Sequence, residues 1–276
     1  MSQPEPRRRA LSDILEGGAR LASRHIVVFL RITAPLILPA SAVFIAVVAW
    51  LKSSSSSNHL AVGILVPVVA VYVLAVMLSG GACVTAAAEA SRGAKPSARA
   101  AIEFVLGRLG PFLCLAALLV VVAAPAIALP ALSSVKALGG YTPFLLIVVL
   151  FSLWLVGTWS VALPAMLEEK TGIVDSLRRS AELVRGSFWR ALGTVVLGGI
   201  LALFAGVLVA ILASVFSFGG EKVVLVVSLI SFALGELLVA PFFAAFLVVL
   251  YRDLLEREQG SSFDRTSRQA ERSANR

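Results

Sequence analysis

The sequence predicts an all-α integral membrane protein in which six transmembrane helices form three parallel helical-hairpin repeats with amphipathic helices on the cytoplasmic side. Three observations predict this fold. The 276 residues are 59% hydrophobic and 14% charged, with a mean hydropathy of +0.94, whereas soluble domains carry about 25% charged residues. The apolar runs are 20 residues or longer without alternation, which favours helices over a β-barrel. Finally, the basic residues gather in only a few segments of the chain.

Six apolar segments are each long enough to cross a hydrocarbon core of ~30 Å, which takes roughly 20 helical residues. They comprise residues 32–51, 60–88, 111–135, 142–167, 191–218 and 223–251. The longer segments must tilt, bend or extend past the lipid. Prolines interrupt most of them, and each proline favours a kink because it removes a backbone hydrogen bond.

Lys and Arg lie almost entirely on one side of the predicted spans. Twenty-one of the 24 fall in residues 1–31, 89–110, 168–190 and 252–276. The other three are Lys52, Lys136 and Lys222. By the positive-inside rule both termini are therefore cytoplasmic. The net charge of +8 is accordingly expected to reflect contact with anionic lipid head groups, and no nucleic-acid partner is predicted.

The spans are expected to form a single domain, residues 10–259, between two tails. Residues 1–9 form a polar, basic tail and residues 260–276 form a second polar tail; both are expected to be disordered. Inside the domain a unit recurs over about residues 10–93, 94–172 and 173–260. Each unit has a basic amphipathic segment, two apolar runs and a closing Glu-x-x-x-Gly. The closing glycines are 79 and 88 residues apart, which predicts three hairpins that point the same way.

Short amphipathic segments at residues 11–25, 96–109 and 173–188 precede the first, third and fifth spans. Helices with one apolar and one basic face lie in the plane of the membrane interface. The three segments would form a basic cytoplasmic collar. Four arginines of this collar are expected to bind anionic lipid head groups or a partner protein. They are Arg178, Arg179, Arg185 and Arg190.

Glu236 is the only acidic residue deep inside a predicted span. A carboxyl at mid-membrane is costly, which marks it as a candidate functional group. Tyr72, at a similar depth in the second span, is its candidate partner. The functional alternatives are a proton relay, a cation site and contact with a lipid head group, and the structural alternative is a hydrogen bond between helices.

The fifth predicted span, residues 191–218, carries a small residue at every fourth position. The positions are Thr194, Gly198, Ala202, Gly206, Ala210 and Ser214. Such a face lets a second helix approach closely. It is expected to pack within the monomer or, alternatively, against a second copy in a homodimer.

Signatures of catalysis are missing from the sequence. It contains no P-loop, no Gly-x-Ser-x-Gly and no paired carboxylates facing a pocket, and its two histidines lack metal-ligand spacing. Acidic residues at the cytoplasmic ends of the spans are expected to form ion pairs. They include Glu168, Glu169, Asp253, Glu256 and Glu258. We therefore predict a non-enzymatic protein with no metal and no cofactor.

Two stretches of sequence carry a family resemblance. The first is Asp-Ser-Leu-Arg-Arg-Ser at residues 175–180 followed by Arg-Gly-Ser-Phe-Trp-Arg at 185–190, and the second is Leu-Tyr-Arg-Asp-Leu-Leu-Glu-Arg-Glu at 250–258. Both resemble the glycerophosphoryl diester phosphodiesterase membrane domain family, whose closing motif is Tyr-x-Asp-Leu; the chain departs from the family pattern at Arg252 and Leu255. The family is named for members fused to a catalytic barrel, for which the six spans leave no room. The resemblance therefore implies a bacterial cytoplasmic-membrane protein without inherited phosphodiesterase activity.

These features lead to two functional hypotheses. The basic collar favours a non-enzymatic scaffold or accessory protein that binds anionic lipid or a partner. Glu236 and the proline-kinked spans favour the alternative, a transporter or lipid-handling channel. A cavity that reaches Glu236 would support the alternative, whereas a tightly packed interior would argue against it.

Overall fold

The computed structural model describes the backbone of residues 11–53, 58–133, 142–215 and 220–274, and the side chains over most of these ranges. Within them the chain is helical and contains no strand, which confirms the all-α prediction. The long helices are α2 (Ile26–Ser53), α3 (Asn58–Ser91), α5 (Leu109–Ser133), α6 (Thr142–Thr158), α9 (Phe188–Val215) and α10 (Gly220–Ala274). The short helices are α1 (Leu11–Arg24), α4 (Ala98–Leu106), α7 (Ala162–Glu169) and α8 (Ile173–Val184). The predicted tail at residues 1–9 lies outside the described residues.

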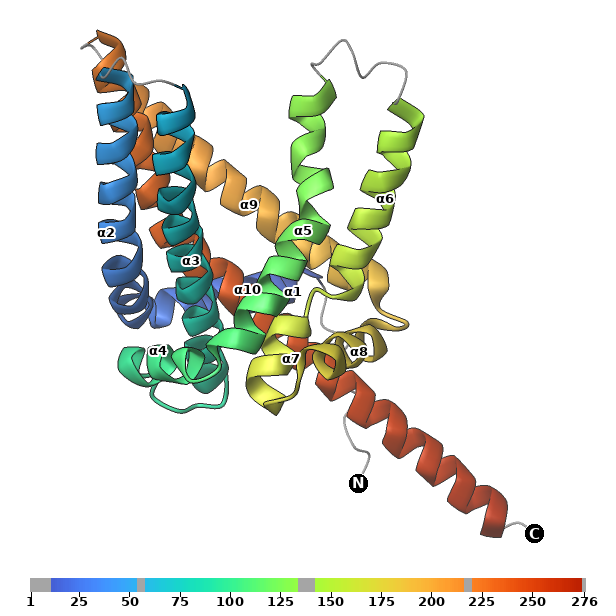
Figure 1. Ribbon diagram of the computed structural model, residues 1–276. Coiled ribbons are helices and arrows are strands. Elements are labelled where there is room, and N and C mark those ends of the chain that lie inside the picture. The colour runs from blue at the N-terminus through green and yellow to red at the C-terminus, as the bar shows by residue number, and fades with distance from the viewer. Residues whose placement is uncertain (1–10, 54–57, 134–141, 216–219, 275–276) are drawn as a thin grey trace.

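Successive long helices pack in pairs: α2 against α3, α5 against α6, and α9 against α10 (Figure 1). The α5–α6 pair stands apart from α2 and α3 over much of its length, and α9 runs obliquely across the molecule. Helix α10 contacts α1, α2, α3 and α9. It therefore joins the α2–α3 hairpin and α1 to α9, whereas the α5–α6 hairpin packs on α9 through α6.

Among the residues that the structure describes, four segments are long and apolar enough to cross a membrane. They are Ile26–Leu51, Gly63–Ser91, Leu146–Glu169 and Ala233–Gly260. A fifth candidate combines Ala98–Leu106 with Leu109–Val122, which are bent by 87° relative to each other. The described apolar part of α9, Phe188–Ile200, is shorter than a span. The molecule is thus a multi-pass helical protein, while the sixth span and the threefold repeat stay predictions.

The predicted span at residues 142–167 is broken at residues 159–161, between α6 and α7. Pro164 is the third residue of α7. A proline here cannot donate to the carbonyl of Ser160, and its ring clashes with that carbonyl in a continuous helix. Pro35, Pro39, Pro67 and Pro241 lie inside unbroken helices, so of these prolines only Pro164 coincides with a break.

The short helices α1, α4, α7 and α8 lie at one end of the molecule, and together with the adjoining ends of the long helices they form what we call the charged end (Figure 1). The main hydrophobic core sits here. It joins Ala82, Ala86 and Ala87 of α3 to Phe112 of α5 and to α7 and α10. Gly81 allows this approach, since a Cβ on it would lie 2.5 Å from the Phe112 ring. The charged end is therefore densely packed.

The opposite halves of the hairpins present large apolar side chains on their surface. Val66, Val71, Val121 and Ile147 are all more than half exposed, at 61%, 57%, 68% and 64%. Exposed apolar side chains in this number are typical of a surface that contacts lipid or another protein. These halves are the part of the molecule that lipid solvates.

Helix α10 continues to Ala274 and so passes through the tail that was expected to be disordered from residue 260. No proline follows Pro241, and a single Gly260 costs a helix only about 1 kcal/mol. The helix therefore continues through residues 260–274 although this segment contains few apolar residues. In Figure 1 this last part of α10 projects away from the other helices.

Candidate functional site

A pocket at the charged end lies where α6, α8 and the start of α9 meet. The hydroxyl of Ser180 on α8 donates to the carbonyl oxygen of Thr158 at the end of α6, at 2.8 Å. This bond satisfies one of the orphan carbonyls that end a helix. Gly157 lets Phe188 pack on α6, because a Cβ at Gly157 would lie 2.7 Å from the Phe188 ring. Gly186, at a φ of +90°, supplies the turn between α8 and α9 that other residues adopt only with strain.

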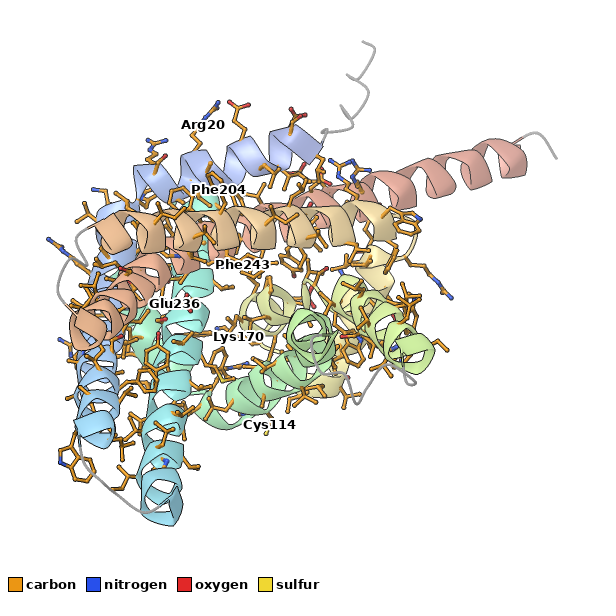
Figure 2. The ribbon with its side chains drawn as sticks, turned by 90° about the horizontal axis from the view of Figure 1, so that it is seen from above. Arg20, Cys114, Lys170, Phe204, Glu236 and Phe243 are labelled. Atoms are coloured by element: carbon orange, nitrogen blue, oxygen red, sulfur yellow. The ribbon has the colours of Figure 1, made fainter. Side chains whose placement is uncertain are left out.

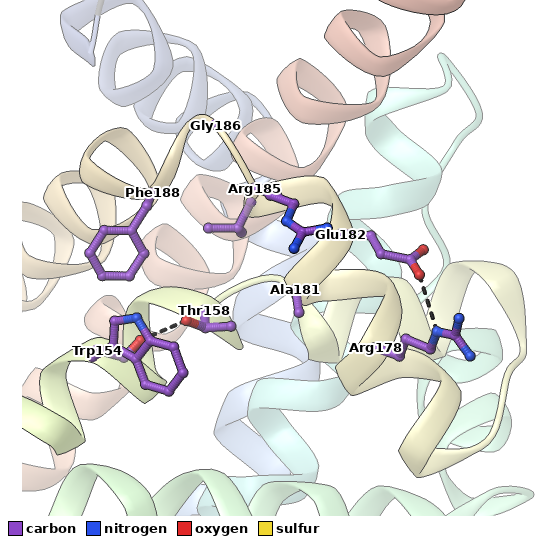
Figure 3. A pocket seen from close by; sticks show the side chains of 9 residues that line it. Trp154, Thr158, Arg178, Ala181, Glu182, Arg185, Gly186 and Phe188 are labelled. Atoms are coloured by element: carbon purple, nitrogen blue, oxygen red, sulfur yellow. Dashed lines mark hydrogen bonds and ion pairs between the residues drawn. The ribbon is translucent and has the colours of Figure 1, made fainter.

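The pocket has a volume of about 520 Å³ and combines aromatic, apolar and cationic walls (Figure 3). Its lining comprises Trp154, Thr158, Arg178, Ala181, Glu182, Val184, Arg185, Gly186 and Phe188. Figure 3 shows the two aromatic rings at one side and Arg178 at the other. A molecule with an anionic head and an apolar body would find complementary surfaces here.

Two of the four predicted arginines, Arg178 and Arg185, line this pocket. The Nε of Arg178 donates to Glu182 at 3.1 Å, and 80% of its side chain is exposed. Arg185 is exposed, and no protein partner for its guanidinium is found among the described residues. Arg185 therefore offers its donors to an anion from outside the protein.

The other two predicted arginines are held in ion pairs away from the pocket. The guanidinium of Arg179 donates to both carboxylate oxygens of Glu258, at 2.8 and 2.7 Å, and to Glu169 at 3.1 Å. The hydrogen bond with Glu258 raises the pKa of Arg179 above its usual range. Arg190 pairs with Asp253 at 3.6 Å. These contacts connect α8 and α9 to α10.

Further ion pairs close the charged end, as the sequence predicted for its acidic residues. Glu168 accepts from Arg92 at 2.6 Å and from Arg252 at 2.8 Å, and its side chain is 7% exposed. The hydroxyl of Tyr251 donates to Glu169 at 2.8 Å. These bonds tie α7 to α10 and to the residues that follow α3.

Glu236 lies on the side of α10 that faces α3 (Figure 2). Glu236 lines a cavity of about 210 Å³ between α3, α7 and α10. Tyr72 interacts with Glu236 electrostatically and with the side chain of Ser41 on α2, and its ring stacks on Phe44 at 5.5 Å. The two residues predicted as partners are therefore neighbours, and their function stays a prediction.

The small-residue face of α9 is described only at its first two positions. Thr194 is buried at 1% exposure, and a Cβ on Gly198 would lie 3.4 Å from the rings of Phe243 and Phe246 on α10. Ala202, Gly206, Ala210 and Ser214 lie outside the residues whose side chains are described. The described part supports packing within the monomer.

A family model described as the membrane domain of glycerophosphoryl diester phosphodiesterase matches residues 135–274, about half of the chain. The chain belongs to this membrane-domain family. The resemblance inferred from residues 175–190 and 250–258 is therefore confirmed. The match is to the membrane domain and not to the catalytic domain of that enzyme. No curated protein and no solved structure matches the chain.

The part that matches the membrane-domain family contains the whole pocket and Glu236, whereas the α3 wall of the cavity precedes it. Trp154 and Phe188 were not among the predicted site residues. An aromatic residue near the end of a span, beside a basic segment, is the signal that could have found them. No group of three or more His, Cys, Asp or Glu residues is placed to hold a metal ion in the described part of the chain.

Proposed function

We propose that this membrane-domain protein is a non-enzymatic scaffold or accessory protein whose charged end binds an anionic phospholipid. The pocket that holds Arg178 and Arg185 above Trp154 and Phe188 is the observation that supports this function. Guanidinium groups bind phosphate through paired, charge-assisted hydrogen bonds. The aromatic rings would contact the glycerol and the upper acyl chains.

The orientation of the protein is part of the proposal. We place the charged end, with both termini, on the cytoplasmic side of a bacterial inner membrane, and all six apolar segments across it, because the basic residues lie on that side. Anionic lipid at this leaflet attracts each nearby Lys or Arg by about 1 kcal/mol. A non-enzymatic role agrees with the pocket, whose one carboxylate, Glu182, is held by Arg178.

Lipid retention tests this function. We expect the double variant Arg178→Gln/Arg185→Gln to lose the preference of the wild-type protein for phosphatidylglycerol over phosphatidylcholine. The readout is native mass spectrometry after purification in mild detergent. Arg20→Gln is the matched control, because Arg20 is exposed and pairs with Glu16 on α1, outside the pocket. Equal retention by the double variant and the wild type would exclude this pocket as the lipid site.

A second candidate function, a transporter or lipid-handling channel, is favoured by the cavity that reaches Glu236. Transport requires that a molecule in this cavity be released on both sides of the membrane. Scrambling of fluorescent phosphatidylglycerol in proteoliposomes measures this directly. A rate equal to that of protein-free liposomes, or an unchanged rate in Glu236→Gln, would remove the candidate.

A further inference from the structure

We infer that the cavity at Glu236 is a binding site inside the membrane for an uncharged amphiphile, a molecule with an apolar chain and one neutral hydrogen-bonding group such as a hydroxyl. This site is separate from the pocket of Arg178 and Arg185, so it does not depend on anionic lipid binding. It deepens the second candidate function by naming the class of ligand.

The depth of the cavity decides which molecules can reach it. Glu236 stands 15 residues before Tyr251 in the continuous helix α10, about 22 Å along the helix axis at 1.5 Å per residue. Tyr251 lies beside Glu169 at the charged end, so the carboxyl is near the middle of the membrane. Only lipid-soluble molecules are abundant at this depth.

The residues that line the cavity favour a ligand whose larger part is apolar. Nine lining residues are apolar, and Glu236 is the one polar exception. The lining is Val76, Gly80, Val84, Leu163, Glu236, Val239, Ala240, Phe243, Ala244 and Leu247. A volume of about 210 Å³ corresponds to roughly seven water molecules at about 30 Å³ each. This is room for a hydroxyl with a segment of aliphatic chain.

The carboxyl of Glu236 favours a ligand that carries one hydrogen-bonding group. Tyr72 interacts with Glu236 electrostatically, but no hydrogen bond to the Glu236 carboxyl is found in the part of the chain that the structure describes. A polar group held in an apolar environment without a hydrogen bond costs free energy. No Lys or Arg lines the cavity, and bringing a charged ligand to this depth carries its own desolvation cost. A neutral hydroxyl satisfies the carboxyl at the lowest cost.

A substitution on helix α3 can fill the cavity while Glu236 is left unchanged. Gly80 forms part of its wall, and a Cβ there would meet no atom within 4 Å. A larger side chain at this position would therefore project into open space. Gly63 also has no atom within 4 Å of a Cβ and lies on the same helix, outside the cavity. Gly63 is thus the matched control for Gly80.

Photo-labelling tests the inference. The full chain in phosphatidylcholine nanodiscs is irradiated with dodecanol that carries a diazirine in its chain, and labelled peptides are mapped by mass spectrometry. We expect labelling within residues 76–84 and 239–247. Gly80→Leu should reduce this labelling about tenfold, with Gly80→Val as a second variant if the first fails to fold. Gly63→Leu should label like the wild type. Equal labelling of the folded Gly80 variants and the wild type would overturn the site.

Competition tests the chemical class. Unlabelled dodecanol should suppress the labelling more than dodecane or dodecylammonium at the same mole fraction, and Glu236→Leu should remove that preference. Equal competition by dodecane, or stronger competition by dodecylammonium, would overturn the assignment of a neutral hydrogen-bonding ligand. Labelling without lipid scrambling would support the binding site while excluding transport, and labelling unchanged in Arg178→Gln/Arg185→Gln would show that the two sites are independent.

Discussion

Asp253 holds two arginines at the charged end. Its side chain is 4% exposed and pairs with Arg190 at 3.6 Å and with Arg257 at 2.9 Å. Asp253→Asn would remove the carboxylate that pairs with both guanidinium groups, which are 18% and 33% exposed. Removing one partner of a buried pair costs 3–5 kcal/mol, and partial exposure of Arg257 favours the lower end, about 3 kcal/mol. Thermal unfolding of the detergent-solubilised protein measures this loss. Glu16→Gln, which breaks an exposed pair on α1, should leave the melting temperature unchanged, and an equal effect of both variants would contradict the prediction.

The four arginines of residues 178–190 show what sequence could and could not predict at this scale. Helical spacing placed Arg178, Arg179 and Arg185 on the polar face of the segment at residues 173–188, and Arg190 follows that segment. The residue that each one meets depends on contacts across the chain, such as Arg179 with Glu258, 79 positions away. Sequence therefore predicted that arginines would gather and that nearby acids would form ion pairs. Only the tertiary structure separates the exposed Arg178 and Arg185 from Arg179 and Arg190, which pair with acidic residues of α10.

At the scale of elements, α1 packs across α10, and the backbone approaches most closely where Gly18 meets Phe246. A Cβ on Gly18 would collide with the Phe246 ring and lie 3.1 Å from its Cα, whereas a Cβ on Gly17 would lie 3.5 Å from Val249. Gly18→Ala should therefore destabilise the protein by about 2 kcal/mol through overpacking. Gly17→Ala should be neutral or slightly stabilising, because alanine favours the helix. Thermal unfolding of the two variants side by side checks the difference, and two equal melting temperatures would show that α1 is free to shift.

The elements themselves were largely predictable, because apolar runs of this length have few alternatives in lipid. The apolar segments and the amphipathic segments before them correspond to helices of the structure. The structure differs in detail from the expected elements at two places, the turn at residues 159–161 and the continuation of α10 to Ala274. The break before Pro164 depends on local backbone geometry, and the continuation of α10 past Gly260 depends on the absence of a stop signal. The angle between the hairpins, visible in Figure 1, depends on packing that a hydropathy pattern does not encode.

At the scale of the whole molecule, the uneven distribution of basic residues makes the topology testable. Paired phosphatase and fluorescent-protein reporters fused after Ser55, Lys136 and Gly219 should report a periplasmic location. Fusions after Gly93, Gly172 and Arg276 should report the cytoplasm. This alternation follows from six spans with both termini inside. Phosphatase activity after Arg276, or two successive fusion points on the same side, would contradict it.

The length of α10 gives the protein a built-in spacer. From Tyr251 at the charged end to Ala274 the helix continues for 23 residues, about 35 Å at 1.5 Å per residue. A protein domain fused after Ala274 would therefore be held away from the bilayer by this helix. Its distance and direction would be set by α10, the same continuous helix that carries Glu236 inside the lipid.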